Sequence, residues 1–262
     1  MKTIRDALRE AAPGTDADRI TVSVYDTLDS TNTLAKERSA EQGPALYVAR
    51  EQTDGRGRLG RRFHSPAHTG LYMTVAYTAD EPLSRAVRAT PLAAVAAVAA
   101  IESLTDKRPA IKWVNDIYLD GCKIGGILTE AVTRPDGTHR MIVGLGINLT
   151  TTTFPDHLRA PAASLFSPQE LSAAEVQAFA DRLAGAIGGR LLDAVNRDDP
   201  APLLDIYRNR LLYVGEPVLC TRGSESFEGT VLGVDDDFSL LVFAQGRTLT
   251  LSSGEISVRP IR

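Results

Sequence analysis

Hydrophobic positions in the first part of the chain follow spacings that predict two helices and three strands. Ile4 and Leu8 lie one helical turn apart within residues 1–12, which predicts a short amphipathic helix. Three apolar runs rich in β-branched and aromatic residues predict strands: 20–25, 45–49 and 71–77. The alanine-rich segment 90–105 is too long for a strand, so it predicts a buried helix with Pro91 in its first position.

A tight hairpin is predicted where a strand over 111–119 meets Asp120-Gly121, a strong two-residue turn signal. We expect Asn115-Asp116 to interrupt that strand and the turn to bring Lys123 close to Asp116. Gly125-Gly126 in the return strand indicates a bulge or the close approach of another group. A solvated lysine at an ordinary turn would give the same pattern, so the segment alone leaves both interpretations open.

The pattern changes near residue 212. After a second turn signal at 135–137, a glycine-containing strand, an irregular connection and two helices are predicted: 141–149, 150–163, about 168–196 with a break at Gly188-Gly189, and 201–211. Five short apolar runs separated by turns then predict a small barrel: 216–220, 227–234, 239–243, 248–251 and 255–258. We therefore expect an α+β fold with a mixed sheet and flanking helices over residues 1–212, and a small β-barrel domain over 213–262.

The composition is that of a globular protein without membrane or metal signatures. The 262 residues are 43% hydrophobic and 24% charged, and the net charge of -4 argues against a surface that binds nucleic acid as a whole. No run approaches the roughly 18 apolar residues of a membrane span, and the N-terminus lacks a signal-peptide core. Cys122 and Cys220 lack metal-ligand spacing. We expect a cytoplasmic protein.

Positive charge is concentrated in residues 55–62, where four arginines and three glycines occur without a carboxylate. Glycine lets the main chain approach a ligand closely, and arginine holds phosphate or carboxylate oxygens with two hydrogen bonds. A solvated basic turn is the alternative. The segment is a long excursion between two predicted strands, however, and such ordered loops are often functional. We predict a site for an anionic ligand.

Three further segments carry candidate chemistry. Residues 29–32 precede a helix-forming run, so they cap that helix or offer hydroxyl, amide and backbone N–H groups to a polar ligand. Only five lysines occur, which draws attention to Lys112 and Lys123 inside motifs. Gly146 would let a flat ring approach, and Asn148 can donate to and accept from a purine edge.

From about Thr27 to Arg259 the chain resembles biotin protein ligases. Six motifs of that family occur in order: Ser30-Thr31-Asn32, the Gly-Arg-Gly-Arg-x-Gly-Arg loop at 55–61, Lys112-Trp113-x-Asn115-Asp116, Lys123-x-Gly125-Gly126-Ile127-Leu128-x-Glu130, Gly144-x-Gly146-x-Asn148 and Gly254-Glu255-Ile256. The resemblance implies a class II synthetase-like catalytic domain followed by an SH3-like barrel.

The resemblance also implies a two-step activity. The carboxylate of biotin attacks the α-phosphorus of ATP, giving biotinyl-5′-adenylate and pyrophosphate, with Mg²⁺ as the accompanying ion. A lysine amine of a biotin carboxyl carrier domain of acetyl-CoA carboxylase or a related enzyme then attacks the activated carbonyl and releases AMP. Both steps build negative charge on oxygens, which suits the predicted anion site.

The family's functional residues carry over to matching positions. Lys123 and Arg58 would be catalytic, and Asp116 would lie at the magnesium end. Biotin would contact Ser30, Thr31, Asn32, Gln52, Gly55, Arg56, Gly57, Arg58, Lys123 and Gly125. ATP or the adenylate would contact Arg56, Arg58, Arg61, Asn115, Asp116, Lys123 and Asn148, with Glu255 and Arg259 reaching the nucleotide from the barrel.

Two positions depart from the family: Val114 replaces a usual proline and Phe63 a usual tryptophan, so we expect local repacking with function retained. The segment before the first strand is too short for an N-terminal DNA-binding domain, which predicts a ligase without DNA contact. Family members occur as monomers and as homodimers.

Three alternatives remain. A lipoate ligase or octanoyl transferase shares the fold, but its Arg-Arg-x-x-Gly-Gly-Gly loop is absent here. A nucleic-acid-binding module would need a wider basic surface and more aromatic residues near the loop than Phe63. An inactive biotin-binding regulator would not need the residues Lys123, Asn115 and Asp116, which this chain retains.

Overall fold

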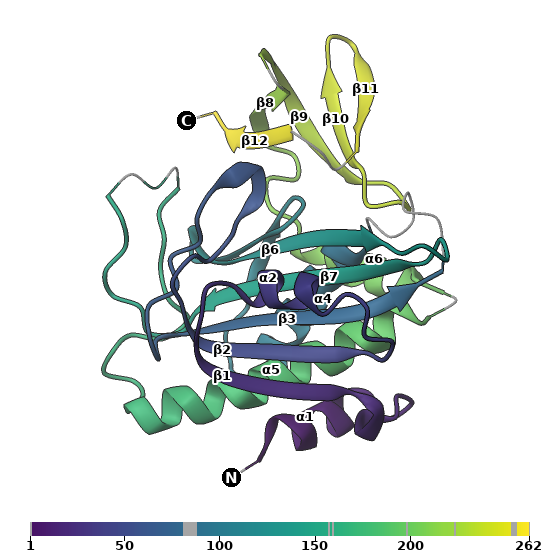
Figure 1. The fold of residues 1–262 in the computed structure, drawn as a ribbon. Coiled ribbons are helices and arrows are strands. Elements are labelled where there is room, and N and C mark those ends of the chain that lie inside the picture. Colours follow the sequence, from purple (N-terminus) through teal and green to yellow (C-terminus); the bar gives the residue numbers. More distant parts are fainter. Residues whose placement is uncertain are drawn as a thin grey trace.

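The computed structural model describes residues 2–80, 88–156, 158, 160–197, 199–222, 224–252 and 256–261. These residues form two β-sheets: a seven-stranded mixed sheet with helices on both faces, and a five-stranded antiparallel sheet beyond one end of it (Figure 1). The expected α+β class is confirmed.

The large sheet has the strand order β1-β2-β3-β7-β6-β5-β4. Only β1 and β2 pair in parallel, and the other neighbours are antiparallel. The strands are β1 (Thr21–Leu28), β2 (Ala45–Gln52), β3 (Gly70–Ala79), β4 (Ala110–Lys112), β5 (Asp116–Leu119), β6 (Cys122–Thr133) and β7 (His139–Asn148).

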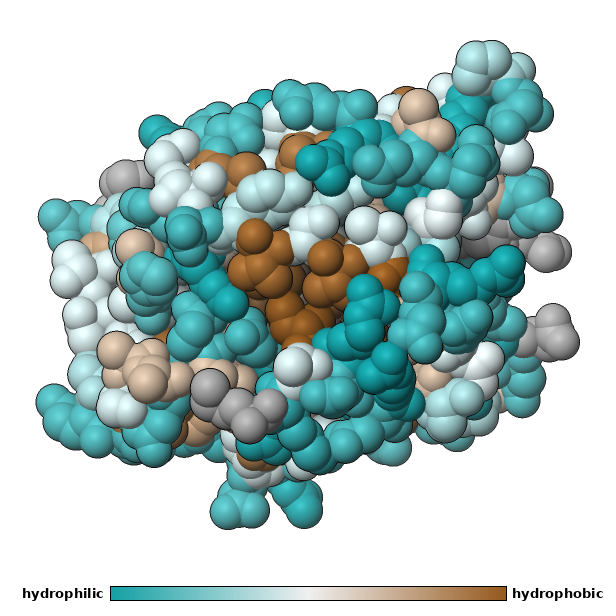
Figure 2. Space-filling model, turned by 60° about the horizontal axis from the view of Figure 1, so that its bottom comes forward, coloured by the Kyte–Doolittle hydropathy of each residue, from teal (hydrophilic) through white to brown (hydrophobic). Residues whose placement is uncertain are grey.

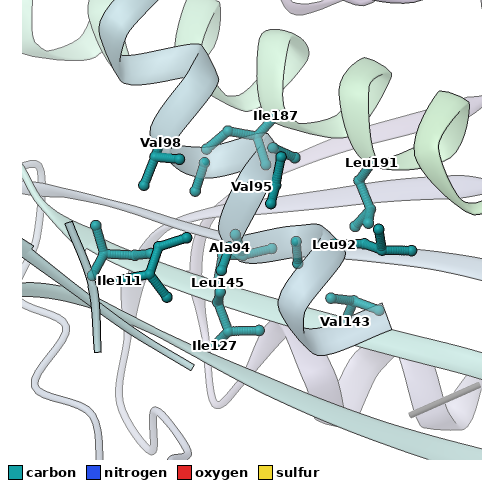
Figure 3. Close-up of a cluster of buried hydrophobic side chains, with 14 of the residues drawn as sticks. Leu92, Ala94, Val95, Val98, Ile111, Ile127, Val143, Leu145, Ile187 and Leu191 are labelled. Atoms are coloured by element: carbon teal, nitrogen blue, oxygen red, sulfur yellow. The ribbon is translucent and has the colours of Figure 1, made fainter. Parts of the chain in front are cut away.

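Alternation along the strands divides the core between the two faces of this sheet. In β2, Leu46 and Val48 join the main core, whereas Tyr47 joins a smaller cluster on the opposite face. Helices α1 (Ile4–Ala11), α4 (Ala89–Leu104) and α5 (Ala173–Val195) contribute to the main core, and α2 (Thr31–Glu37) to the smaller cluster. Figure 3 shows α4 between the strands and α5, with labelled side chains of all three in contact.

Helix α5 differs from the prediction because it begins at Ala173 and continues through Gly188-Gly189 without a break. The glycines of α5 lie instead at the point where α1 crosses this helix. A Cβ on Gly185 would lie 2.3 Å from the carbonyl oxygen of Ile4, and one on Gly189 would lie 2.9 Å from that of Leu8. Close helix packing, and not a helix end, therefore explains these glycines.

The segment 111–119 also differs from the prediction. Instead of one interrupted strand it forms two short antiparallel strands, β4 and β5, with Lys112 opposite Asp116. Residues 113–115 make the turn between them, and the peptide bond between Trp113 and Val114 is cis. Pro91 is the third residue of α4, not the first, because the helix begins at Ala89.

The five strands predicted after residue 212 are all present and form one sheet. Its order is β11-β10-β9-β8-β12. The strands are β8 (Pro217–Arg222), β9 (Glu225–Val234), β10 (Leu240–Ala244), β11 (Arg247–Leu251) and β12 (Ile256–Pro260), and α6 (Ala201–Arg210) precedes them. The indole Nε1 of Trp113 donates to the carbonyl oxygen of Phe238 at 2.9 Å, which joins this sheet to the β4–β5 turn.

The face of the molecule drawn in Figure 2 is mostly hydrophilic. Figure 2, in which the bottom of Figure 1 comes forward, shows hydrophobic side chains gathered in a depression at the centre of that face, bordered by hydrophilic ones. Within the described residues, no helix has the length and apolarity needed to cross a membrane.

Candidate functional site

The hairpin of β5 and β6 brings a lysine and a carboxylate together at its end. Asp120 and Gly121 both have positive φ, 49° and 77°, as the tight two-residue turn requires. The Lys123 ammonium donates to Asp116 Oδ1 at 2.6 Å, and the Asn115 amide donates to the same oxygen at 3.2 Å. The predicted proximity of Lys123 and Asp116 is confirmed.

The bulge expected in the return strand is also present, as a register shift between Ile117 and Tyr118 opposite β6. The two glycines beside it leave room for neighbours. A Cβ on Gly126 would lie 3.3 Å from Lys123 Nζ, and one on Gly125 would lie 2.7 Å from the carbonyl oxygen of Gly146. Glycine at these positions therefore lets the lysine side chain and β7 approach closely.

The arginine loop between β2 and β3 folds into a narrow hairpin of its own. Gly57 N–H donates to Arg61 O at 2.8 Å, and Phe63 N–H donates to Gly55 O at 2.8 Å. The turn at its tip is the 3-10 element η2 (Arg58–Gly60), and Arg56 is exposed. The loop is thus ordered by its own backbone.

Arg58 connects this loop to the lysine hairpin. Its NH1 group donates to Asn115 Oδ1 at 2.8 Å, which brings the guanidinium next to the Lys123 and Asp116 pair. Burial lowers the pKa of Arg58, and the nearby Asp116 carboxylate opposes this decrease. Arg58 lies at the site, whereas Arg56 and Arg61 are exposed beside it.

Lys112 adds a further cation at the same place. Its ammonium lies 5.6 Å from the centre of the Tyr118 ring. Burial lowers the pKa of Lys112, Asp116 opposes the decrease, and the positive charges of Lys123 and Arg259 add to it. Positive groups thus outnumber Asp116 here, which is an arrangement that favours an anionic ligand.

A chain of polar side chains, most of them buried, runs from the start of α2 to the base of the arginine loop. Ser30 Oγ accepts from Asn32 N–H as the cap of α2, so the capping interpretation is confirmed. Thr31 donates from both N–H and Oγ1 to Gln52 Oε1, at 2.9 and 3.2 Å. The Gln52 amide donates in turn to Ser65 Oγ at 3.0 Å.

Glycines of β7 and the loop make space around this chain. A Cβ on Gly144 would lie 2.2 Å from Asn32 Oδ1, and one on Gly146 would lie 2.4 Å from the Phe63 ring. A Cβ on Gly55 would lie 2.6 Å from Ser65 Oγ. The flat ring expected over Gly146 is therefore, in this structure, the Phe63 side chain of the chain itself.

Not every predicted site residue lies open in this arrangement. Asn148 is buried, and its amide donates to the carbonyl oxygen of Ala163 at 3.0 Å. Arg259 lies on β12 and is exposed. Glu255 lies outside the described residues.

Sequence reasoning assigned no role to three residues of the site. Thr74 is a fully buried polar residue in the middle of a largely apolar strand, a pattern that could have drawn attention to it. Ser65 closes the loop onto Gln52, and its burial could not be read from the chain. Glu130 accepts from the Asn32 amide at 2.9 Å, a contact across 98 residues of sequence.

The donor set around Asp116 limits how a metal ion could bind. Within the described residues, no group of three or more histidine, cysteine or acidic side chains could hold a metal ion. Mg²⁺ is commonly held by one or two carboxylates together with phosphate oxygens and water, and Asp116 fits that requirement as a single carboxylate. The residues present therefore fit a magnesium ion carried by a nucleotide.

A separate hollow of about 420 Å³ lies near the end of the β5–β6 hairpin. Its lining includes Lys107, Leu119, Phe154 and Phe166, and none of the residues predicted for the site lines it. The chemical groups described above are therefore gathered outside this hollow.

Comparison with known proteins gives consistent results. The model of the biotin/lipoate A/B protein ligase family matches residues 24–148. The bifunctional ligase/repressor BirA of Bacillus spizizenii is 33% identical over 243 residues, which cover 89% of this chain and 72% of that protein. The biotin–[acetyl-CoA-carboxylase] ligase of Paracoccus denitrificans is 31% identical over 236 residues, which cover 87% of this chain and 96% of that protein.

The fold is similar to a solved structure along almost the whole chain. The biotin protein ligase of Aquifex aeolicus, solved in complex with biotin and ATP, superposes with a TM-score of 0.74 at 25% sequence identity. The similarity covers 92% of this chain and 99% of that one.

Proposed function

The chain belongs to the biotin protein ligases of the biotin/lipoate A/B protein ligase family, and from this premise we propose that it attaches biotin to a carrier protein with ATP. The observation that carries the proposal is the contact of Arg58 with Asn115, which joins the arginine loop to the Lys123–Asp116 pair. The Aquifex aeolicus relative, solved with biotin and ATP, supports the same two substrates here.

In the first step, a carboxylate oxygen of biotin forms a bond to the α-phosphorus of ATP while the bond from that phosphorus to pyrophosphate breaks. In the second step, a lysine amine of the carrier bonds to the biotinyl carbonyl carbon, the bond to AMP breaks, and the amine loses a proton. Negative charge develops on phosphate oxygens first and on the carbonyl oxygen second. Fixed donors directed at those oxygens accelerate both steps.

Lys123 and Arg58 would supply those donors. An ammonium has three N–H donors, so Lys123 can keep its bond to Asp116 and still donate to a carboxylate or α-phosphate oxygen. The Arg58 guanidinium, placed by its bond to Asn115, brings a planar positive charge to the same position. Partial burial strengthens both interactions because the local dielectric is lower than in water.

Biotin would lie along the polar chain, with Ser30, Thr31, Asn32 and Gln52 toward its cyclic urea. Hydroxyl and amide groups in a buried setting bind a ligand that supplies both donors and acceptors. Gly55 to Gly57 and Gly125 would let the backbone approach the ligand. Arg56 at the loop and the Lys123 ammonium would then face its carboxylate.

ATP would occupy the end marked by Asn115 and Asp116, with the exposed Arg56 and Arg61 toward its phosphates. Bound Mg²⁺ would neutralise phosphate charge there, with Asp116 as its protein ligand. Asn148 would contact adenine only after its bond to Ala163 opens. Arg259 would bring charge from the second sheet, in line with a catalytic domain over 1–212 and a small domain over 213–262.

The partner would be a biotin carboxyl carrier domain of acetyl-CoA carboxylase or a related enzyme. The sequence motifs include no Ser/His/Asp or Cys/His set for acyl transfer, which agrees with a nucleophile supplied by the carrier lysine. We propose a monomer or homodimer that acts without DNA contact.

The test is transfer of labelled biotin to a carrier domain, with ATP and magnesium, by wild type and by Lys123→Ala. Loss of a charge-assisted donor to the transition state should lower the rate about 100-fold or more. Lys107→Ala is the control, because Lys107 pairs with Glu170 outside the site and should leave the rate unchanged.

Two results would contradict the proposal. Wild type that binds biotin but labels nothing would indicate an inactive biotin-binding regulator. Wild type that ignores biotin and accepts lipoate or octanoate would indicate the related ligase of the same fold.

A further inference from the structure

The carboxylate of Glu130, on β6, accepts hydrogen bonds from two side chains of helix α2. Its Oε2 accepts from the Asn32 amide at 2.9 Å, and its Oε1 accepts from the Lys36 ammonium at 2.6 Å. Asn32 and Lys36 are four residues apart, so they lie on one face of α2. One carboxylate therefore sets the distance and rotation of the helix that carries the candidate biotin contacts.

The carboxylate also fixes the orientation of the Asn32 amide. An ionised carboxylate only accepts hydrogen bonds, so the NH₂ group of Asn32 faces Glu130, and it also donates to the carbonyl oxygen of Leu128 at 3.3 Å. The carbonyl oxygen then faces the Thr74 hydroxyl, which donates to it at 2.7 Å. Asn32 and Thr74 are 3% and 0% exposed, so the bond between them is shielded from water.

This orientation determines which hydroxyl group donates to which oxygen along the row of polar side chains. The Thr74 hydroxyl has one proton and two acceptors in range, Asn32 Oδ1 at 2.7 Å and Thr31 Oγ1 at 2.8 Å. A carboxylate bound to the Asn32 NH₂ group polarises the amide and makes its oxygen the stronger acceptor. With that proton on Asn32, Thr31 Oγ1 supplies the proton of its own 2.8 Å bond to Thr74 Oγ1, while the Thr31 N–H donates to Gln52 Oε1. Thr31 Oγ1 is then left to accept from a ligand N–H.

We propose that Glu130 is a positioning residue that, through Asn32 and Thr74, fixes the donor and acceptor pattern of the pocket for a ligand with a cyclic urea. The inference rests on the proposed function and deepens it to selectivity. A ligand with both N–H and C=O groups satisfies a fixed pattern, whereas an acyl chain without a polar end leaves buried groups unpaired.

The variant Glu130→Gln keeps the shape of the side chain and removes its charge. Oε1 and Oε2 of Glu130 each face a different donor, so in glutamine one of the two places is taken by an NH₂ group that faces Lys36 or Asn32. We expect biotin affinity, measured by calorimetry without ATP, to weaken about tenfold, since one charged hydrogen bond in a buried chain is lost. Desthiobiotin, which keeps the cyclic urea, should weaken equally, while weak binding of octanoate and the KM for ATP should stay within about twofold.

Glu102→Gln is the matched control. Glu102 pairs with Arg210 at 2.7 Å with side-chain exposures of 27% and 29%, close to the 26% and 34% of Glu130 and Lys36. It joins α4 to α6, away from the polar chain. We expect it to lower the melting temperature by as much as Glu130→Gln does and to leave biotin affinity unchanged.

Unchanged biotin affinity in a folded Glu130→Gln protein would overturn the inference. So would a parallel weakening for biotin, octanoate and ATP, because that pattern belongs to a general structural role. If Glu130→Gln fails to fold, Thr74→Val tests the next bond of the same chain, and equal weakening of biotin and desthiobiotin is again the supporting result. Wild type that forms no biotinyl-adenylate would refute the proposed function itself, and the inference with it.

Discussion

At the scale of single residues, the site depends on small groups that leave room as much as on charged groups that bind. Lys123 is held by Asp116, and Arg58 by Asn115, so both cations have defined positions. Gly144 contributes by having no side chain, because any side chain there would occupy the position of the Asn32 amide. The polar chain is possible only because β7 lacks a side chain at that point.

Gly144→Ala should therefore weaken biotin binding more than tenfold. Its Cβ would lie 2.2 Å from Asn32 Oδ1, and the amide cannot move without breaking its bonds to Glu130 and Thr74. Overpacking of this kind also costs about 1–3 kcal/mol of stability. Calorimetry with biotin and urea denaturation measure the two effects. Gly14→Ala, where nothing lies within 4 Å of the added Cβ, is the control and should change neither.

At the scale of elements, the contact between α1 and α5 shows how glycine in a helix can serve packing. Gly185, Gly188 and Gly189 lie along the face of α5 that meets α1 and β2. A helix-breaking tendency of about 0.5–1 kcal/mol per glycine is offset here by the close approach of two helices. The pair of glycines therefore does not end α5.

Gly185→Ala tests whether the gain in helix propensity or the cost of overpacking against α1 is larger. Alanine favours the helix by about 0.5–1 kcal/mol, but its Cβ would lie 2.3 Å from the backbone oxygen of Ile4, and overpacking costs about 1–3 kcal/mol. We expect net destabilisation in urea denaturation. Gly188→Ala is the matched control in the same helix. Its Cβ would meet only side-chain ends, those of Leu8 at 3.3 Å and Leu46 at 3.4 Å, and no backbone atom, so it should be much less destabilising than Gly185→Ala. Equal effects of the two substitutions would contradict this account.

At the scale of the whole molecule, the two sheets meet at the β4–β5 turn. Trp113 donates to the Phe238 carbonyl oxygen, and the Phe238 ring contacts Tyr207 edge to face at 5.3 Å. Arg208 of α6 donates to the carbonyl oxygen of Val234 at 3.1 Å. The turn that positions Asn115 and Asp116 is thus also in contact with the second sheet.

Trp113→Phe should loosen this junction. The substitution keeps an aromatic ring but leaves the buried Phe238 carbonyl oxygen without its indole donor, which costs about 1–3 kcal/mol. We expect a lower urea midpoint by circular dichroism and a raised KM for ATP, since Arg259 belongs to the second sheet. An unchanged midpoint with an unchanged KM would show that the junction does not depend on this bond.

Local features of the chain were sufficient to predict most elements. The turn at Asp120-Gly121, the bulge after it and the five late strands follow from residue types a few positions apart, and the structure has all of them. The same reasoning predicted Lys123 near Asp116, because a two-residue turn places the residues on its two sides on adjacent strands, and the structure decided for this contact over a solvated lysine. Where the prediction was wrong, as at Gly188-Gly189 and at residues 113–115, a partner distant in sequence determined the outcome.

The sequence by itself thus determined most of the secondary structure, the concentration of positive charge and the motif order that identifies a biotin protein ligase. Only the tertiary structure decided that Glu130 holds Asn32, that Gly144 makes room for it and that Asn148 is engaged by Ala163. The reason is physical. Backbone conformation depends on neighbouring residues, whereas a buried hydrogen bond depends on which groups the fold brings within about 3 Å of each other.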